Sequence, residues 1–280
     1  MIKLIWWFKM AVGFFDKTLL KKTFHIAMTF GSIVGTVAVF IHDVIDENTK
    51  LVIIIYISSV FMAYIFLLIW ANLNKKITLK IGPSTFEIRQ GDIFKENYLK
   101  VINFNEYFDT KVDNRVIAKN SLNGKFITEY VDDISELDRY IDESLVMVEE
   151  NKKRKDGKKK RYKLGEIVEY KGFLITSFTK FDENNMAYLT LNDYLEFLMN
   201  FWNNLNRVYA NRTVAITLFG NSSLTRIKDL FDITEQELVE IILWTFKISK
   251  IKFKYPTKIC LILDDEATKK INLFELKERY

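Results

Sequence analysis

The chain has 280 residues, one cysteine, two histidines and a formal net charge of only +5. This small charge argues against a nucleic-acid partner, and the lone Cys260 suits a reducing compartment because it cannot form an intrachain disulfide. His25 and His42 both lie in the N-terminal quarter, so the rest of the chain has no histidine for Ser-His-Asp or Cys-His catalysis or for zinc. We therefore expect no catalytic residues, no metal site and no nucleic-acid binding.

Two runs near the N-terminus, residues 24–41 and 51–73, contain no Asp, Glu, Lys or Arg. As α-helices they would span about 27 and 34 Å, close to the ~30 Å hydrocarbon core of a bilayer. The first run is too far from the start, and lacks a small-residue cleavage site, to be a signal peptide. The second is too long and too apolar on every face for a buried hairpin of a soluble protein. We predict a transmembrane helical hairpin over residues 24–73.

The charges around the two runs predict their orientation. Lysines lie before the first run and after the second, whereas the connecting residues 42–50 hold three acidic residues and a single lysine. Positive charge stays on the cytoplasmic side of a membrane. We expect a multi-pass protein of the cell inner membrane with both termini cytoplasmic.

Residues 1–23 form a further expected segment, in which aromatic residues alternate with lysines. Trp6, Trp7, Phe8, Phe14 and Phe15 could lie at headgroup depth while the lysines face anionic lipid. We predict an interfacial amphipathic helix that contacts membrane lipid. The alternative is a plain cytoplasmic extension of the first span.

The first span also contains a G-x-x-x-G pattern, Gly31 and Gly35, with Ala27 in the same register. Small residues at this spacing let two helices approach closely in lipid. The pattern could pack the hairpin on itself, pack protomers together into oligomers, or occur by chance.

Residues 77–280 alternate between strand-like and helix-like segments. Strands are expected at 77–82, 86–93, 100–104, 165–170, 173–178, 213–219 and 258–263, and helices at 134–149, 190–209, 234–247 and 267–278. Thr234 and Glu237 form a possible capping box. This order predicts an α/β domain with a mixed sheet between helices.

Residues 151–163 (NKKRKDGKKKRYK) contain nine basic residues and one acidic residue. A basic loop of this kind is usually solvated. The alternatives are contact with anionic lipid, or binding of nucleic acid or a phosphate ligand.

Three loops follow predicted strands, where α/β sheets bind ligands. They are Gly91-Asp92-Ile93, the stretch 103–110 continuing to 121–124, and residues 219–223 (FGNSS). Small residues allow backbone N–H groups to approach a diphosphate, and a following helix N-terminus favours anions. Each loop taken singly is a weak signal.

The order of these loops along the chain, followed by a last strand that ends in Leu263-Asp264-Asp265, resembles the macro domain. This family binds ADP-ribose and related nucleotides. By this resemblance Asp92 and Ile93 would lie by the adenine, the loop from Asn103 to Thr110 near the distal ribose, and Gly220 to Arg226 around the diphosphate. The expected ligand-binding residues are Asp92, Ile93, Asn103, Asn105, Asp109, Thr110, Ser121, Leu122, Asn123, Gly124, Gly220, Asn221, Ser222, Ser223, Leu224, Thr225 and Arg226.

The chain departs from the macro pattern at one place. The family's glycine-rich stretch after its asparagine is missing, because NFNEYFDTKVDNR contains no glycine. That stretch positions the distal ribose in hydrolytic macro domains, so its loss puts hydrolysis in doubt and leaves binding intact.

Two spans followed by a divergent macro domain, with the segments GDIF, FDT, SLNGKF and LFGNSS, resemble the ThsA effector family of type II Thoeris antiphage systems. The resemblance implies that a TIR-domain partner converts NAD into an ADP-ribose conjugate. This ligand, and no other cofactor, would bind the macro domain and trigger oligomerisation and membrane disruption. The alternatives are a membrane-anchored ADP-ribosyl hydrolase and a non-catalytic membrane scaffold.

Overall fold

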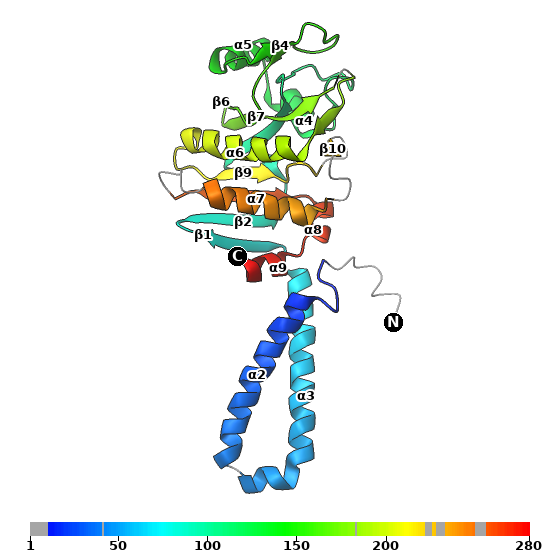
Figure 1. Ribbon diagram of the computed structural model, residues 1–280, viewed down its shortest axis with the longest axis vertical. Coiled ribbons are helices and arrows are strands. Elements are labelled where there is room, and N and C mark those ends of the chain that lie inside the picture. Colours follow the sequence, from blue (N-terminus) through cyan, green and yellow to red (C-terminus); the bar gives the residue numbers. More distant parts are fainter. Residues whose placement is uncertain (1–10, 41, 183, 222–225, 228–232, 250–255) are drawn as a thin grey trace. The chain divides into compact units, whose positions relative to one another are not determined.

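The computed structural model (Figure 1) describes residues 11–40, 42–182, 184–221, 226–227, 233–249 and 256–280. The chain divides into two compact units. The first comprises residues 1–77 together with 268–280, and the second comprises residues 78–267. The C-terminal residues thus group with the helical hairpin, whereas the sequence pattern predicts them in the α/β domain.

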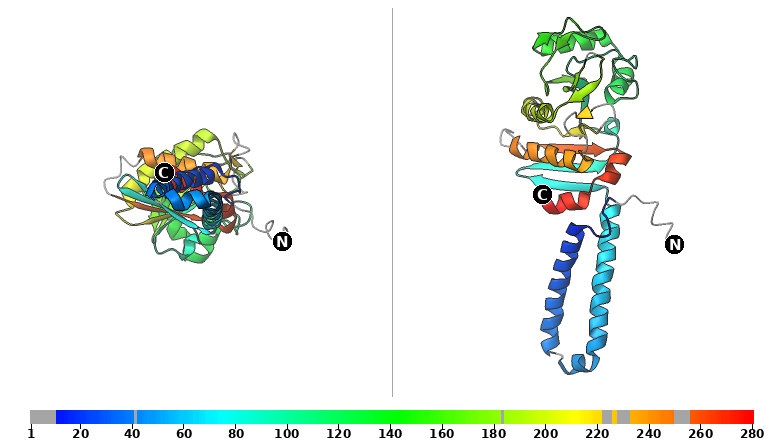
Figure 2. Two further views of the ribbon diagram at one scale, coloured as in Figure 1. Left: turned by 90° about the horizontal axis from the view of Figure 1, so that it is seen from below. Right: turned by 45° about the vertical axis from the view of Figure 1, so that its right-hand side comes forward.

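The first unit contains the two long helices that the apolar runs predict, α2 (Lys17–Phe40) and α3 (His42–Leu73). Within them, Lys17–Val39 and Asn48–Leu73, of 23 and 26 residues, are long and apolar enough to cross a membrane. Only 6% and 11% of the apolar stretches of these two helices are buried within the protein, so their apolar side chains face outward. The two helices run side by side (Figure 2). Asn48 has a non-helical φ of −119°, which marks a kink before the second apolar stretch.

Residues 11–22 do not form the separate interfacial helix that the aromatic–lysine pattern predicts. Residues 11–16 are a bend and a turn, and α2 begins at Lys17 because the Asp16 carboxylate accepts a hydrogen bond from Leu19 N at 2.8 Å. Asn72 of α3 pairs with both backbone groups of Val12, at 3.1 Å each. These contacts fix the segment to the end of α3. Residues 2–10 lie outside the described part of the chain.

A tyrosine of α3 packs against the small residues of α2. The Tyr56 hydroxyl donates to the Ala27 carbonyl at 2.7 Å, and a Cβ on Gly31 would lie 3.0 Å from that hydroxyl. By contrast, a Cβ on Gly35 would meet nothing within 4 Å. Gly31 therefore packs the hairpin on itself, while Gly35 lies open.

The C-terminal helix α9 (Leu273–Arg279) covers one end of the hairpin. Phe274 is 3% exposed and lies edge-on to Trp70, with ring centroids 6.2 Å apart. The Asn272 side chain donates to Asp16 at 3.0 Å, and Lys22 forms an ion pair with Glu278. Asn272 also caps α9, so the helix predicted over 267–278 is divided into α8 (Asp265–Lys270) and α9.

The second unit is built on a mixed sheet of nine strands in the part of the chain that is described. The order is β1 (Lys76–Ile81), β2 (Ser84–Gln90), β11 (Lys258–Leu263), β9 (Val214–Thr217), β3 (Leu99–Asn105), β7 (Phe173–Phe181), β8 (Ala187–Leu189) and β10 (Arg226–Ile227), with β6 (Ile167–Tyr170) also paired to β7. The five strands from β2 to β7 are mutually parallel. Their carboxyl ends therefore meet at one edge of the sheet.

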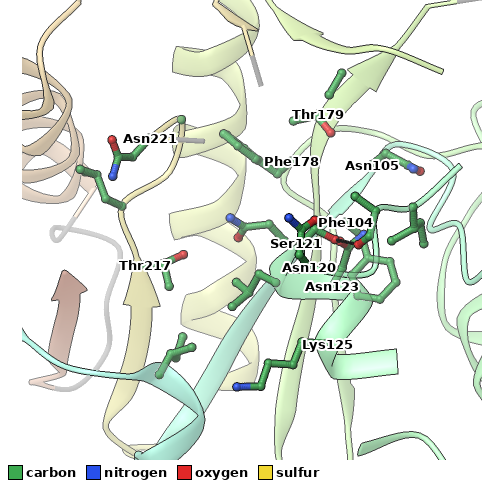
Figure 3. A pocket seen from close by; sticks show the side chains of 18 of the residues that line it. Phe104, Asn105, Asn120, Ser121, Asn123, Lys125, Phe178, Thr179, Thr217 and Asn221 are labelled. Atoms are coloured by element: carbon green, nitrogen blue, oxygen red, sulfur yellow. Dashed lines mark hydrogen bonds between the residues drawn. The ribbon is translucent and has the colours of Figure 1, made fainter. Parts of the chain in front are cut away.

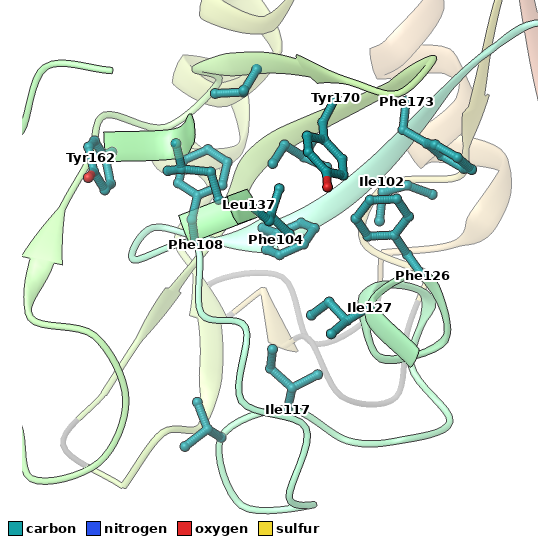
Figure 4. Packing of buried hydrophobic residues seen from close by; sticks show 14 residues of the cluster. Ile102, Phe104, Phe108, Ile117, Phe126, Ile127, Leu137, Tyr162, Tyr170 and Phe173 are labelled. Atoms are coloured by element: carbon teal, nitrogen blue, oxygen red, sulfur yellow. The ribbon is translucent and has the colours of Figure 1, made fainter. Parts of the chain in front are cut away.

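Helices cover both faces of this sheet, as the alternating pattern predicts. On one face α4 (Leu122–Tyr130) and α5 (Ile134–Ser144) contribute Phe126, Ile127 and Leu137 to a core with Ile102 and Phe173 (Figure 4). On the other face α6 (Leu191–Val208) and α7 (Glu235–Ser249) lie side by side (Figure 1). Their cores join through Trp202 and Phe246, whose ring centroids are 5.1 Å apart.

The ends of the helices follow their capping residues. Glu237 N donates to Thr234 Oγ1 at 3.2 Å, and the Glu237 carboxylate accepts from Thr234 N at 2.8 Å, so the predicted capping box of α7 is confirmed. Helix α5 ends at Ser144, five residues before the predicted end. The chain then enters the short hairpin of β4 (Glu149–Glu150) and β5 (Lys160–Arg161), which encloses most of the basic run.

Helix α4 has no counterpart among the predicted elements, because Ser121-Leu122-Asn123-Gly124 is typical of a turn. Ser121 caps the helix by accepting from Gly124 N at 3.1 Å. A Cβ on Gly124 would lie 2.2 Å from the Ala118 carbonyl oxygen, so only glycine allows this approach.

We expect Gly124→Ala to destabilise the fold, although alanine is intrinsically the better helix residue by about 1 kcal/mol. The steric clash should outweigh that gain and lower the free energy of unfolding by about 1–3 kcal/mol, measured by urea denaturation of the detergent-solubilised chain. Gly13→Ala is the control, since its Cβ meets nothing within 4 Å. An increase in stability on Gly124→Ala would contradict the contact.

Cys260 lies in the middle of β11 and is fully buried, and burial raises the pKa of its thiol from 9.0 to about 11. Because the thiolate is the reactive species, its fraction at pH 8 should be about 100-fold lower than that of an ordinary thiol. We expect negligible reaction with a thiol reagent in the folded chain and one equivalent in guanidinium chloride. Rapid reaction of the native protein would show that β11 is exposed.

Candidate functional site

A cavity of about 880 Å³ lies across the carboxyl ends of the parallel strands. Each of these strands contributes to its lining: Gly91 follows β2, Asp264 follows β11, Thr217 ends β9, and Asn105 and Thr179 belong to β3 and β7. Neighbouring strands are roughly 4.8 Å apart, so the four steps from β2 to β7 cover about 19 Å. The cavity thus suits an elongated ligand.

The β2 end of the cavity is formed by Gly91, Asp92 and Ile93, as the sequence predicts. Asp92 Oδ1 accepts from Phe94 N at 3.0 Å and begins a short helix, η1 (Ile93–Lys95). Phe94 also lines the cavity and stacks on Tyr130, with centroids 5.1 Å apart, while Lys125 Nζ lies 4.7 Å from its ring centroid. This end therefore offers an acidic side chain beside an aromatic surface.

The turn after β9 contributes Gly220 and Asn221 to the lining. Gly220 has a φ of +88°, a conformation that glycine adopts without strain, and Asn221 N donates to Leu218 O at 3.4 Å. The predicted residues Ser222, Ser223, Leu224 and Thr225 lie outside the described residues. Arg226 begins β10, and it lies opposite Tyr188 of β8 in the parallel pairing of these two strands.

The first turn of α4 lies against the cavity, where Ser121, Leu122 and Asn123 line it. Figure 3 shows Asn120, Ser121 and Asn123 on the side away from Thr217 and Asn221. A helix N-terminus carries partial positive charge and unpaired N–H groups, which favour an anion such as a phosphate. Gly124 is not a lining residue. Its part is the close contact that lets α4 begin here.

Two asparagines of β3, Asn103 and Asn105, line the cavity. Asn103 Oδ1 is buried and has no hydrogen-bond partner among the residues that the structure describes. A buried acceptor without a partner costs about 1–3 kcal/mol, so a ligand that donates to it would recover this free energy. Asn105 is 2% exposed, and its Oδ1 accepts from Tyr107 N at 3.0 Å.

Asp109 and Thr110 are not among the lining residues. Asp109 is 1% exposed, and both of its carboxylate oxygens face the Arg154 guanidinium, at 3.1 and 2.7 Å. Thr110 donates to Asp138 at 2.8 Å. The residues predicted near the distal ribose are therefore divided: Asn103 and Asn105 reach the cavity, whereas Asp109 and Thr110 lie behind it.

Other lining residues are not predicted by the sequence analysis. They come from the segment after β3, the end of β7 with the turn that follows it, and the end of β11, and they include Asn114, Arg115, Val116, Ile117, Ala118, Asn120, Phe181, Asn185, Met186 and Asp264. In the sequence, these lining segments are marked only by the glycine-free loop after Asn105 and by Asp264-Asp265 after β11. Neither identifies which side chains face inward.

The basic run is largely neutralised by its surroundings. Residues 132–163 contain nine acidic and ten basic side chains, a net charge of +1. Lys158 pairs with Asp138 at 2.6 Å, Lys160 with Asp142 at 2.5 Å and Arg161 with Glu149 at 2.8 Å. Lys152, Lys153 and Lys155 remain exposed.

The lining carries few groups suited to proton transfer. Its charged side chains are Asp92, Arg115, Lys125 and Asp264. Burial raises the pKa of the Glu106 carboxyl, and the Arg161 guanidinium 3.7 Å away opposes this rise. Glu106 accepts a hydrogen bond from Phe181 N and is not a lining residue. No cluster of three or more metal-binding side chains occurs in the described ranges. The uncharged polar part of the lining consists of asparagine amides and of serine and threonine hydroxyls, and apolar side chains such as Phe104, Phe178 and Ile262 complete it.

The chain resembles known proteins over most of its length. Residues 86–264 match a family model described as "Thoeris protein ThsA, Macro domain". A relative from Bacillus amyloliquefaciens (strain Y2), "Thoeris protein ThsA", is 39% identical over 285 residues, which cover 98% of this chain and 93% of the relative.

Solved structures that resemble it include the Oceanobacillus iheyensis macrodomain with ADP, at 16% identity and a TM-score of 0.42, covering 73% of this chain and 96% of that one. A mutant of the same macrodomain gives 14% identity and a TM-score of 0.45, covering 73% and 99%. The family model and the near full-length relative show that this chain belongs to the ThsA family of Thoeris proteins and carries a ThsA macro domain.

Proposed function

We propose that this chain is a membrane effector of antiphage defence whose macro domain binds an ADP-ribose-derived signalling nucleotide. A TIR-domain partner would make this ligand from NAD and deliver it by diffusion. Binding would drive self-association of the hairpins and disruption of the inner membrane, with both termini cytoplasmic. The relative's name as a Thoeris protein supports the role in defence.

The observation that carries this proposal is the elongated cavity at the carboxyl ends of five parallel strands. Asp92 at one end can accept from an exocyclic amine such as that of adenine. The Gly220 turn and the N-terminus of α4 supply backbone N–H groups for a diphosphate. The asparagines of β3 lie beyond them, where a sugar would follow.

The surroundings of Asp109 favour a binding role over hydrolysis. A carboxylate held by a bidentate guanidinium and excluded from the cavity cannot serve as a general base for water at the ligand. Among the described lining residues, the carboxylates are Asp92 and Asp264, which lie at the end of the cavity remote from the predicted distal ribose.

The apolar hairpin is the part of the chain that can act on a bilayer. The apolar stretches of its helices carry few charged side chains, so a single protomer offers no polar conduit. Several hairpins brought together would perturb the bilayer more than one. A ligand can favour such an assembly only by binding it better than the separate protomers, and about 5.5 kcal/mol of difference moves the ratio from 1:99 to 99:1.

Asp92→Asn should weaken binding of ADP-ribose to the detergent-solubilised chain at least tenfold, measured by calorimetry. The amide keeps an acceptor for Phe94 N but replaces the acceptor for adenine with a donor. Asp92→Ala should weaken binding as well, with additional loss of the cap. Glu143→Ala removes an exposed carboxylate as a control. Unchanged affinity in Asp92→Asn, with wild-type binding intact, would show that adenine does not bind at this end.

Gly31→Leu should reduce ligand-triggered release of dye from vesicles while leaving nucleotide affinity within twofold. The larger side chain would displace Tyr56 and separate the two helices of the hairpin. Gly35→Leu is the matched variant, because a Cβ on Gly35 would meet nothing within 4 Å. Loss of release in Gly35→Leu alone would instead identify the open face as the contact between protomers, and full release in Gly31→Leu would exclude a role for hairpin packing.

A further inference from the structure

A buried ion pair joins the basic run to the residues behind the cavity. Arg154 is 6% exposed, and its two terminal nitrogens contact the two carboxylate oxygens of Asp109 at 3.1 and 2.7 Å. Asp109 also accepts from Lys158 N at 2.7 Å and from Asn105 Nδ2 at 2.9 Å. Charge-assisted bidentate bonds of this kind fix both partners in direction as well as distance.

Arg154 also contacts a residue that lines the cavity, Asn185. Its Nε and Nη2 atoms donate to Asn185 Oδ1 at 3.2 and 2.8 Å. A guanidinium has donors and no acceptor, so the amide must turn its oxygen toward Arg154. The Nδ2 group of Asn185, which carries two N–H donors, is then the part left to reach a ligand.

The backbone around Asn185 holds this position. Asn185 has a φ of +59°, which asparagine tolerates better than most residues, and its N–H donates to Asp182 O at 3.0 Å. The Arg154 guanidinium lies 4.0 Å from the ring centroid of Tyr107 and 5.7 Å from that of Phe181, another lining residue. Arg154 thus contacts two lining residues, Phe181 at the end of β7 and Asn185 in the following turn, and it holds Asn105 through Asp109.

We propose that Arg154 is a positioning residue that orients Asn185 so that its amide N–H groups meet acceptor oxygens of the ligand. The Asn185 amide follows β7, about 19 Å across the strands from Asp92, which follows β2. The acceptors therefore belong to the part of the ligand remote from adenine, such as the hydroxyl oxygens of a distal sugar. This inference rests on the proposed function and adds a role for one cation of the basic run.

The test compares ADP-ribose with ADP, which lacks the distal sugar, by calorimetry on the full chain in detergent. Asn185→Asp keeps acceptors for Arg154 but removes the donors that face the cavity. It should weaken ADP-ribose binding at least tenfold and change ADP binding less than threefold. Asn184→Asp adds the same charge at the neighbouring exposed residue and should change neither affinity.

Arg154→Lys keeps the positive charge and loses the two-pronged contact. It should reduce the preference for ADP-ribose over ADP by a similar factor, and adding Asn185→Asp to it should cause little further loss, because both changes remove one interaction. A merely structural arginine would weaken both ligands equally. That result, or an unchanged preference in Asn185→Asp, would overturn the proposal. If the wild-type chain binds neither nucleotide, the proposed function fails and this inference fails with it.

Discussion

Parallel pairing of β2, β11, β9, β3 and β7 is the constraint on which the candidate site depends. Each strand enters the sheet in the same direction, so every following loop emerges at the same edge. The loops come from positions near 91, 105, 181, 220 and 264, far apart in the sequence. A one-residue change in the register of one strand would displace the loop that follows it. It would also turn the side chains of that strand to the opposite face of the sheet, because side chains alternate between faces along a strand.

The polar groups of the site are held by partners from several elements. Asn105 is fixed by Asp109, Asp109 by Arg154, and Arg154 in turn fixes Asn185. Such networks are stable when every member is satisfied and costly when one is lost. The buried acceptor of Asn103, which has no partner, is the exception in the described lining, and it suits a group reserved for a ligand.

Much of the fold could be predicted from the sequence, because hydrophobic periodicity and capping residues act locally. The strands at 258–263 and 100–104, the α7 cap and the two apolar helices follow such local patterns. Helix α4 escapes prediction since Gly124 is favoured by a contact with Ala118 rather than by helix propensity. The division of the C-terminal segment depends on Asn272 and Phe274 packing against the hairpin, contacts that no local pattern reveals.

The site is less predictable than the fold. The residues at strand ends, Asp92, Asn103 and Gly220, could be identified from loop chemistry and resemblance. Asp109 lies outside the lining because its carboxylate is held by Arg154, 45 residues away in a run whose composition indicates only a solvated surface. The same ion pairs give the basic run a role in building the domain, which charge counting alone could not reveal.

The most direct test of the account is to titrate one vesicle-reconstituted sample with the products that a TIR-domain partner forms from NAD, using NAD alone as the reference. Nucleotide occupancy of the macro domain and release of an entrapped dye would be followed together. We expect release of the dye to rise with nucleotide occupancy and to be absent with NAD. Saturation of the cavity without release, or release without occupancy, would contradict the claim that the cavity controls the hairpins.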